Sequence, residues 1–167
     1  MKQCLRRLLT VGVSFAVAGI MLTAAAFATS GAHFFNVSSS VNDNGALIVS
    51  YDEAGVGNAT VNYTIHIDNA TAVYACINGG GNHPKAANKE TVSGGLTVGF
   101  SRDPTNGRVT GATSPAIGPQ PKGSFECPSG QTLVLASVSY TGITLTDTTN
   151  NVSTPVPDAS RTFVNLR

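Results

Sequence analysis

The sequence predicts an all-β fold: an antiparallel β-sandwich, immunoglobulin-like in a broad sense, with seven or eight strands and one disulfide. Short runs of alternating apolar and polar residues recur along the chain, which is the period of a half-buried strand. Turns rich in Gly, Asn and Pro separate these runs. Two cysteines remain once a leader is removed, the number needed for one bridge. With 11% charged and 41% hydrophobic residues, the composition excludes a disordered chain and a coiled coil. Collagen is excluded because glycine does not recur at every third position.

The strands are expected from their residues in chain order. Val61, Tyr63, Ile65 and Ile67 alternate with polar residues and give one apolar face. An Asn-Gly turn at residues 42–45 and a Pro-Asn-Gly turn at residues 103–107 each separate two strands. The other strands are expected at residues 46–51, 71–77, 96–100 and 108–112, and as two runs within 131–147 broken near Gly142.

Three stretches of the chain are not expected to form buried strands. Residues 78–90 read as a long polar loop, and residues 113–130 contain four prolines and should be extended or irregular. Residues 148–160 should be mobile or form a sheet edge, because Pro155 and Pro157 cannot donate to a central ladder.

The N-terminal 28 residues read as a secretory signal peptide that precedes a single sandwich domain at residues 29–167. Lys2, Arg6 and Arg7 form a positive segment, an uncharged apolar run follows, and Ala-Phe-Ala at residues 26–28 fits a cleavage site after Ala28. An uncleaved anchor is the alternative, because a run of this length could span a bilayer. The mature protein is expected to be secreted or at the cell surface.

Cleavage of the leader changes both the charge and the cysteine count. It removes three positive charges and no negative ones, so the net charge falls from +1 to −2. The seven remaining basic residues are scattered, which argues against a nucleic-acid partner. Cys76 and Cys127 remain and should form a disulfide in an oxidising compartment. Closing a loop of about 50 residues should stabilise the fold by about 4 kcal/mol.

No complete catalytic pattern occurs in the sequence. There is no G-x-S-x-G nucleophile elbow. Adjacent Asp52 and Glu53 should point to opposite faces of a strand and cannot converge as a glycosidase pair. His33, His66 and His83 are expected at the surface rather than in a triad. We therefore expect a protein that is not an enzyme.

No metal or cofactor is expected either. The turns at residues 42–45 and 103–107 leave calcium open as an alternative, but ordinary turn chemistry explains their Asn, Asp and Gly residues. The glycine run at residues 79–81 lacks the Lys-Ser/Thr of a phosphate loop. Five Asn-x-Ser/Thr sequons matter only if the source glycosylates the protein: Asn36, Asn58, Asn62, Asn69 and Asn151.

The chain resembles two groups of known proteins. Residues 72–76, with Tyr74 two residues before Cys76, resemble the Tyr-x-Cys of an immunoglobulin F strand. The partner cysteine lies downstream here and the chain has no Trp, so the likeness implies a sandwich in general. Residues 76–81, 87–91 and 127–131 resemble a group of short exported bacterial proteins that have no assigned activity, and this likeness implies no functional residues.

These observations favour an exported, non-catalytic protein that makes contacts at a cell surface or in a matrix. Its partner would be a surface protein, another copy of itself or a polysaccharide. A carbohydrate-binding module and a pilus-type subunit are the alternatives. Two or more exposed tyrosines in one plane would favour the first, and a missing strand would favour the second. The predicted contact surface is the polar loop, with the residues Asn82, His83, Lys85, Asn88 and Lys89.

Overall fold

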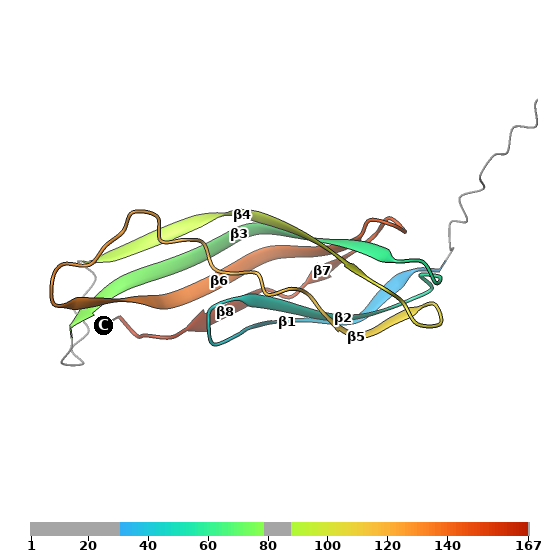
Figure 1. Ribbon diagram of the computed structural model, residues 1–167, viewed down its shortest axis with the longest axis horizontal. Coiled ribbons are helices and arrows are strands. Elements are labelled where there is room, and N and C mark those ends of the chain that lie inside the picture. The colour runs from blue at the N-terminus through green and yellow to red at the C-terminus, as the bar shows by residue number, and fades with distance from the viewer. Residues whose placement is uncertain (1–30, 79–87, 167) are drawn as a thin grey trace, which may run out of the picture.

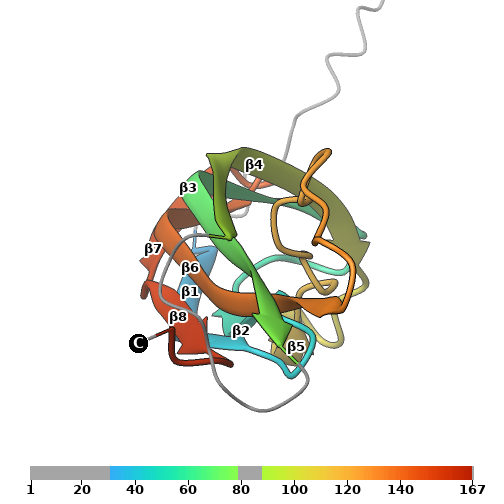
Figure 2. The same ribbon diagram turned by 90° about the vertical axis from the view of Figure 1, so that its left-hand side faces the viewer.

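The computed structural model describes residues 31–78 and 88–166, where all regular structure is β-strand. The strands in these ranges are β1 (His33–Val41), β2 (Leu47–Ala54), β3 (Val61–Asn78), β4 (Lys89–Arg102), β5 (Arg108–Thr113), β6 (Gln131–Asp147), β7 (Val152–Val156) and β8 (Ala159–Thr162). They form two antiparallel sheets, ordered β1-β2-β5 and β4-β3-β6-β7, and β8 also pairs with β6. The sheets pack face to face in an elongated molecule (Figures 1 and 2). The predicted all-β sandwich is confirmed.

The two sheets differ in length. β3, β4 and β6 contain 18, 14 and 17 residues, whereas β1, β2 and β5 contain 9, 8 and 6. At about 3.3 Å per residue, β3 is about 60 Å long and β2 about 26 Å. The short sheet therefore faces only part of the long sheet (Figure 1). Residues 114–130, which we call the covering coil, lie against part of the remainder.

The covering coil connects the short sheet to the long one. Its Ile117 is buried and exchanges two backbone hydrogen bonds with Leu47 of β2, at 2.9 and 3.0 Å. Further along, the Tyr74 hydroxyl of β3 donates to the Gln120 carbonyl at 2.7 Å. The Gln120 side-chain amide donates to the Gly94 carbonyl of β4 at 3.1 Å. The irregular conformation expected for this proline-rich stretch is confirmed.

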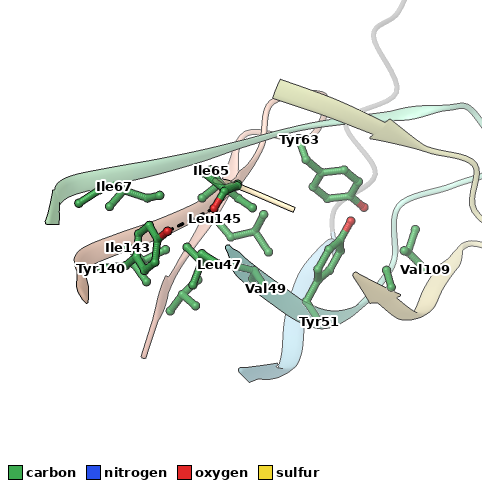
Figure 3. Packing of buried hydrophobic residues seen from close by; sticks show 14 of the residues in the cluster. Leu47, Val49, Tyr51, Tyr63, Ile65, Ile67, Val109, Tyr140, Ile143 and Leu145 are labelled. Carbon is green, nitrogen blue, oxygen red and sulfur yellow. Dashed lines mark hydrogen bonds between the residues drawn. The ribbon is translucent and has the colours of Figure 1, made fainter. Parts of the chain in front are cut away.

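The hydrophobic core lies between the inner faces of the two sheets. On β3 the apolar residues that alternate in the sequence are all buried, and the intervening Asn62 and His66 are exposed. Each buried side chain of this size stabilises the fold by about 1.5–3 kcal/mol. Figure 3 shows the central group: Leu47, Val49, Tyr51, Tyr63, Ile65, Ile67, Val109, Tyr140, Ile143 and Leu145.

β3 and β6 are each one continuous strand where the sequence predicted two. A register shift between Ile67 and Ala70 forms a bulge that lets β3 continue as one strand to Asn78. β6 likewise continues through Gly142, which has a φ of +64°, so the expected break is absent. The expected loop at 78–90 is also shorter than predicted, because β3 ends at Asn78 and β4 begins at Lys89.

The prediction of a sheet edge near the C-terminus is confirmed. Pro155 lies on β7, which forms its backbone ladder with β6 alone. β1 packs beside β7 and β8 on this side of the sandwich. The Ser39 hydroxyl of β1 donates to the Pro157 carbonyl at 2.6 Å, and Arg161 of β8 donates to the Val41 carbonyl at 3.1 Å. These contacts close one side of the sandwich.

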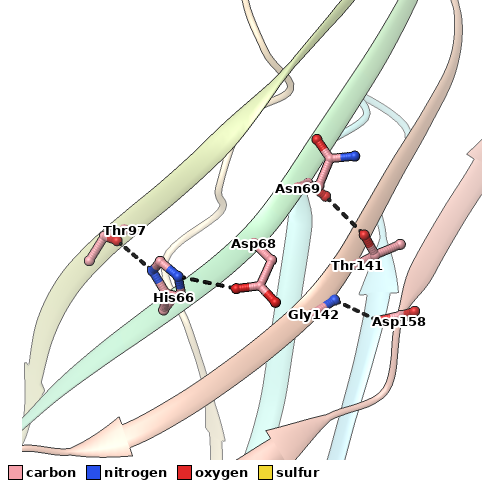
Figure 4. Close-up of polar contacts among 7 residues, drawn as sticks. All are labelled: His66, Asp68, Asn69, Thr97, Thr141, Gly142 and Asp158. Carbon is pink, nitrogen blue, oxygen red and sulfur yellow. Dashed lines mark hydrogen bonds and ion pairs between the residues drawn. The ribbon is translucent and has the colours of Figure 1, made fainter.

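Gly142 lies beside the β3 bulge on the outer face of the long sheet (Figure 4). Its N–H donates to the Asp158 carboxylate at 3.0 Å, at the junction between β7 and β8. A Cβ added at Gly142 would overlap the Asp68 side chain. Two features therefore favour glycine at position 142: the left-handed backbone conformation, and the Asp68 side chain that occupies the place of a Cβ.

Replacing Gly142 by Ala should destabilise the fold more than replacing Gly123 by Ala. Both glycines have a positive φ, +64° and +62°, so each alanine carries the left-handed backbone penalty of about 1 kcal/mol. Nothing lies within 4 Å of a Cβ added at Gly123, whereas at Gly142 the Asp68 side chain must also move. Urea unfolding of the two variants and the wild type gives the loss in free energy of unfolding for each. Equal losses would contradict the role assigned to Asp68.

Candidate functional site

The disulfide predicted between Cys76 and Cys127 is present. It joins the end of β3 to the covering coil, with a Cα–Cα distance of 5.5 Å, within the usual range for a disulfide. The backbone N–H of Cys76 donates to the Asn88 carbonyl at 3.0 Å. The bridge therefore holds the covering coil beside the last residues of β3. It also indicates an oxidising setting outside the cytoplasm.

The predicted contact residues divide into two groups. Asn82, His83 and Lys85 lie outside the described residues. Asn88 has a structural role, because its side-chain amide donates to the Gln131 side-chain carbonyl at 3.2 Å and its backbone carbonyl accepts from Cys76. Lys89 is exposed at the start of β4. Of the predicted contact residues in the described ranges, Lys89 is thus the one free to meet a partner.

The structure adds a groove that the sequence did not predict, next to this end of β4. It has a volume of about 550 Å³ and lies between Glu90 and Val92 of β4 and residues 121–126 of the covering coil. Phe125 is half-buried in its wall. Lys122 donates from Nζ to the Phe125 carbonyl at 2.8 Å, and the Phe125 N–H donates to the Lys122 carbonyl at 3.3 Å. The four prolines within residues 113–130, which predicted an irregular stretch, were the sequence signal for this wall.

A second hollow lies near the β4–β5 turn, at the other end of the molecule. It has a volume of about 520 Å³ and is lined by Arg102 and Arg108 among other residues. The Arg102 guanidinium lies over the Phe100 ring at 5.3 Å, and that of Arg108 over the Phe35 ring at 5.6 Å. Cation–π contacts of this kind hold the guanidinium groups flat against the surface.

Both described histidines are exposed, and one of them, His66, lies between a hydroxyl and a carboxylate. His66 is exposed, as predicted; its Nδ1 lies 2.9 Å from the Thr97 hydroxyl and its Nε2 lies 3.3 Å from the Asp68 carboxylate (Figure 4). His33 is exposed on β1, and its Nδ1 lies 2.6 Å from the Gly31 carbonyl. In the described ranges, three or more His, Cys, Asp or Glu side chains nowhere gather as metal ligands.

The Asn-Gly turn at residues 42–45, for which calcium was the alternative, is held by hydrogen bonds to the Asn42 side chain. Asn42 Oδ1 accepts hydrogen bonds from the backbone N–H groups of Asn44 at 3.0 Å and Ala46 at 2.9 Å. This is the Asx-turn chemistry that favours Asn at such positions. In the second turn, the Asp103 carboxylate accepts from the Thr60 hydroxyl at 2.6 Å.

The tyrosines do not form a sugar-stacking surface. Tyr51, Tyr63 and Tyr140 are buried, and Tyr74 is half-buried with its hydroxyl bound to the covering coil. The structure describes all four tyrosines of the chain. Two exposed tyrosines in one plane, the arrangement that would have favoured a carbohydrate-binding module, do not occur.

The least expected feature is a pair of carboxyl groups buried inside the sandwich. Glu53 of β2 and Asp147 of β6 come from opposite sheets, and both have an exposed fraction of 0%. Asp52 occupies the other face of β2, where it accepts hydrogen bonds from Asn36 and Gly111. The predicted divergence of Asp52 and Glu53 is thus confirmed. The partnership with Asp147, almost 100 residues away, was invisible in the sequence.

The two buried carboxyl groups have unequal surroundings. Asp147 accepts three hydrogen bonds from N–H groups of the turn that follows it, at 2.8, 2.9 and 2.6 Å. Glu53 accepts one hydrogen bond, from the Tyr63 hydroxyl at 2.6 Å. In the described part of the chain, Glu53 Oε1 and the neighbouring Tyr51 hydroxyl have no hydrogen-bond partner. Glu53 is therefore the group that burial penalises when charged.

The pKa of Glu53 is raised from its ordinary 4.5 to about 7, chiefly by burial; the Tyr63 hydrogen bond opposes the rise and the neighbouring Asp147 adds to it. Burial also raises the pKa of the Tyr51 and Tyr63 hydroxyls, which stay protonated. Neither carboxyl group lines the two hollows described above. Both acids have an exposed fraction of 0%, so their ionisation bears on the stability of the fold.

Glu53 should make the protein more stable in acid than at neutral pH. A raised pKa in the folded state gives stability that is complete below the unfolded value of 4.5 and is lost as the pH rises through about 7. The contribution of Glu53 to the free energy of unfolding therefore differs by about 3 kcal/mol between acid and neutral pH. Glu53→Gln should flatten the free energy of unfolding between these two pH values, measured by urea unfolding. The exposed control Glu126→Gln should keep the wild-type slope, and a Glu53→Gln variant with that same slope would contradict the assignment.

Comparisons with known proteins identified no relative: no family model, curated protein or solved structure matches the chain. Within the described ranges, the structure contains no helix with the length and apolarity needed to cross a membrane.

Proposed function

We propose that the mature chain is an exported, non-enzymatic β-sandwich that makes contacts at a cell surface or in an extracellular matrix. The observation that carries the proposal is the distribution of reactive groups. The carboxyl groups of Glu53 and Asp147, which meet inside the sandwich, are buried, and the described histidines are exposed and line neither hollow. A protein of this kind presents surfaces to a partner rather than a reactive cleft.

The outer face of the long sheet supports a contact role. Its exposed residues on β3 and β4 are mostly Ser, Thr and Asn. Hydroxyl groups pair across the strands, Thr71 with Ser93 and Thr146 with Ser153, each at 2.9 Å. Such pairs order a polar surface without charging it. The groove beside Glu90 adds a concave feature near the predicted contact loop.

The sheet topology favours this role over that of a pilus-type subunit. A subunit that awaits a donor strand would have a gap in one of its sheets. In the described ranges, β4, β3, β6 and β7 form one continuous ladder and the inner faces enclose the core. Export itself is supported by the leader-like segment of the sequence and by the disulfide.

Beads coated with residues 29–167 should retain a protein from the envelope fraction of the source organism, in a saturable manner, while a glycan array stays blank. Beads that carry the reduced and alkylated chain provide the control and should retain nothing. Saturable binding to a polysaccharide would instead favour the carbohydrate-binding alternative. Failure to retain any component, or chemical conversion of the retained material, would contradict the proposal.

A further inference from the structure

The outer edge of β4 is an unpaired strand edge. β4 forms its ladder with β3 alone, and within residues 31–78 and 88–166 no other backbone segment pairs with its far side. The Gly94 carbonyl accepts from the Gln120 side chain rather than from a strand, so it points away from β3. Because backbone direction alternates along a strand, the other even-numbered residues of β4 also present their N–H and C=O groups outward.

In the described ranges, the edges of β7, β1 and β5 have features that hinder strand pairing, whereas the covering coil meets the edge of β4 through the Gln120 side chain at Gly94 and leaves it without a paired strand. β7 carries Pro155, β1 has a register shift and packs beside β7 and β8, and β5 has only six residues. Between Glu90 and Arg102, β4 has no charge, no proline and no register shift of its own. Charges, prolines, bulges and short length are the devices that keep strand edges from pairing. A long edge without them is suited to strand addition.

We propose that β4 pairs antiparallel with β4 of a second copy of this chain, about a two-fold axis through Leu96. In this register Glu90 faces Arg102 of the second copy, and Lys89 faces Asp103 of the second copy. Opposite charges thus meet at both ends of an otherwise uncharged strand pair. A shift by two residues would lose both matches, so the charges select this register.

The side chains on both faces of β4 also fit this register. The inward-facing residues Val92, Leu96, Val98 and Phe100 are all half-buried, as the edge leaves them uncovered on one side. Val92 would face Phe100 of the second copy, and Leu96 would face its own counterpart. On the outer face Thr91 would meet Ser101 of the second copy. Apolar side chains therefore meet apolar ones, and hydroxyl groups meet hydroxyl groups.

The groove beside β4 provides a second wall for the incoming strand. Its volume of about 550 Å³ lies along Glu90 and Val92, with Phe125 and Glu126 on the covering coil opposite. The Arg102 guanidinium of the second copy donates to the Ser101 and Thr113 carbonyls of its own chain, and its remaining N–H groups would face the carboxylates of Glu90 and Glu126. Gln120 can remain bound to the Gly94 carbonyl, because a carbonyl oxygen accepts two hydrogen bonds.

This inference rests on the proposed contact role and names its partner as a second copy, but the two can fail separately. Retention of a different envelope protein by a monomeric chain would leave the contact role intact and remove only the pairing of β4. Dimers that bind nothing else would support the pairing and limit the contact role to self-association.

Sedimentation equilibrium of residues 29–167 should show a monomer–dimer equilibrium. Glu90→Arg should weaken dimerisation by about tenfold, because it places like charges opposite each other. Arg102→Glu should do the same, and the double variant should restore the wild-type affinity. Asp43→Arg is the control: it reverses a charge in the β1–β2 turn that pairs with Arg161 of its own chain, and it should leave dimerisation unchanged. Melting temperatures identify any variant that is misfolded.

Cysteine cross-linking tests the register without reversing a charge. A mixture of Thr91→Cys and Ser101→Cys chains should form a covalent dimer on mild oxidation, because these positions face each other in the proposed pair. A mixture of Thr91→Cys and Thr97→Cys chains is the out-of-register control. A chain that stays monomeric, a dimer indifferent to Glu90→Arg, or equal cross-linking in both mixtures would overturn the proposal.

Discussion

The unequal lengths of the two sheets are the constraint on which the rest of the structure depends. β3 and β6 extend well beyond β2 and β5, so apolar side chains at the disulfide end have no strand opposite them. The covering coil supplies part of the missing layer, and the Cys76–Cys127 bridge holds it there. A coil rich in proline can do this because it needs few backbone hydrogen bonds of its own. The groove at this end exists because a coil, rather than a strand, lies beside β4.

The two ends of the sandwich therefore have different physical characters. At one end, a covalent bond and a few side-chain hydrogen bonds hold the coil in place. At the other, Tyr51, Tyr63 and Glu53 pack between complete sheets together with Asp147. The hydrogen bond between Tyr63 and Glu53 joins the two sheets, and burial makes the Glu53 carboxyl group resist ionisation. Side chains of the types that catalyse reactions are thus enclosed in the core, while the exposed features suit contact.

The local features of the fold were predictable from the sequence, and the long-range ones were not. Alternation in residues 61–67 predicted both the strand and its buried face, and the cysteine count predicted the disulfide. The strand at His33–Val41 was missed as an element of its own, because its serine-rich second half has weak apolar alternation. Gly142 looked like a strand break, but Asp158 satisfies its N–H and β6 continues through it. The meeting of Glu53 and Asp147, and the outer edge of β4 that no described segment pairs with, depend on how the sheets assemble and leave no local pattern.

The disulfide keeps the covering coil on the part of the long sheet that the short sheet does not face. The groove beside β4 depends on this position of the coil. Backbone hydrogen exchange, compared between the oxidised chain and Cys127→Ser, tests the claim most directly. We expect amides in residues 71–78 and 131–136 to lose protection by about tenfold or more, whereas those in residues 61–67 and 143–147, opposite the short sheet, should change little. Unchanged protection at the disulfide end, or an equal loss along the whole length of β3 and β6, would contradict it.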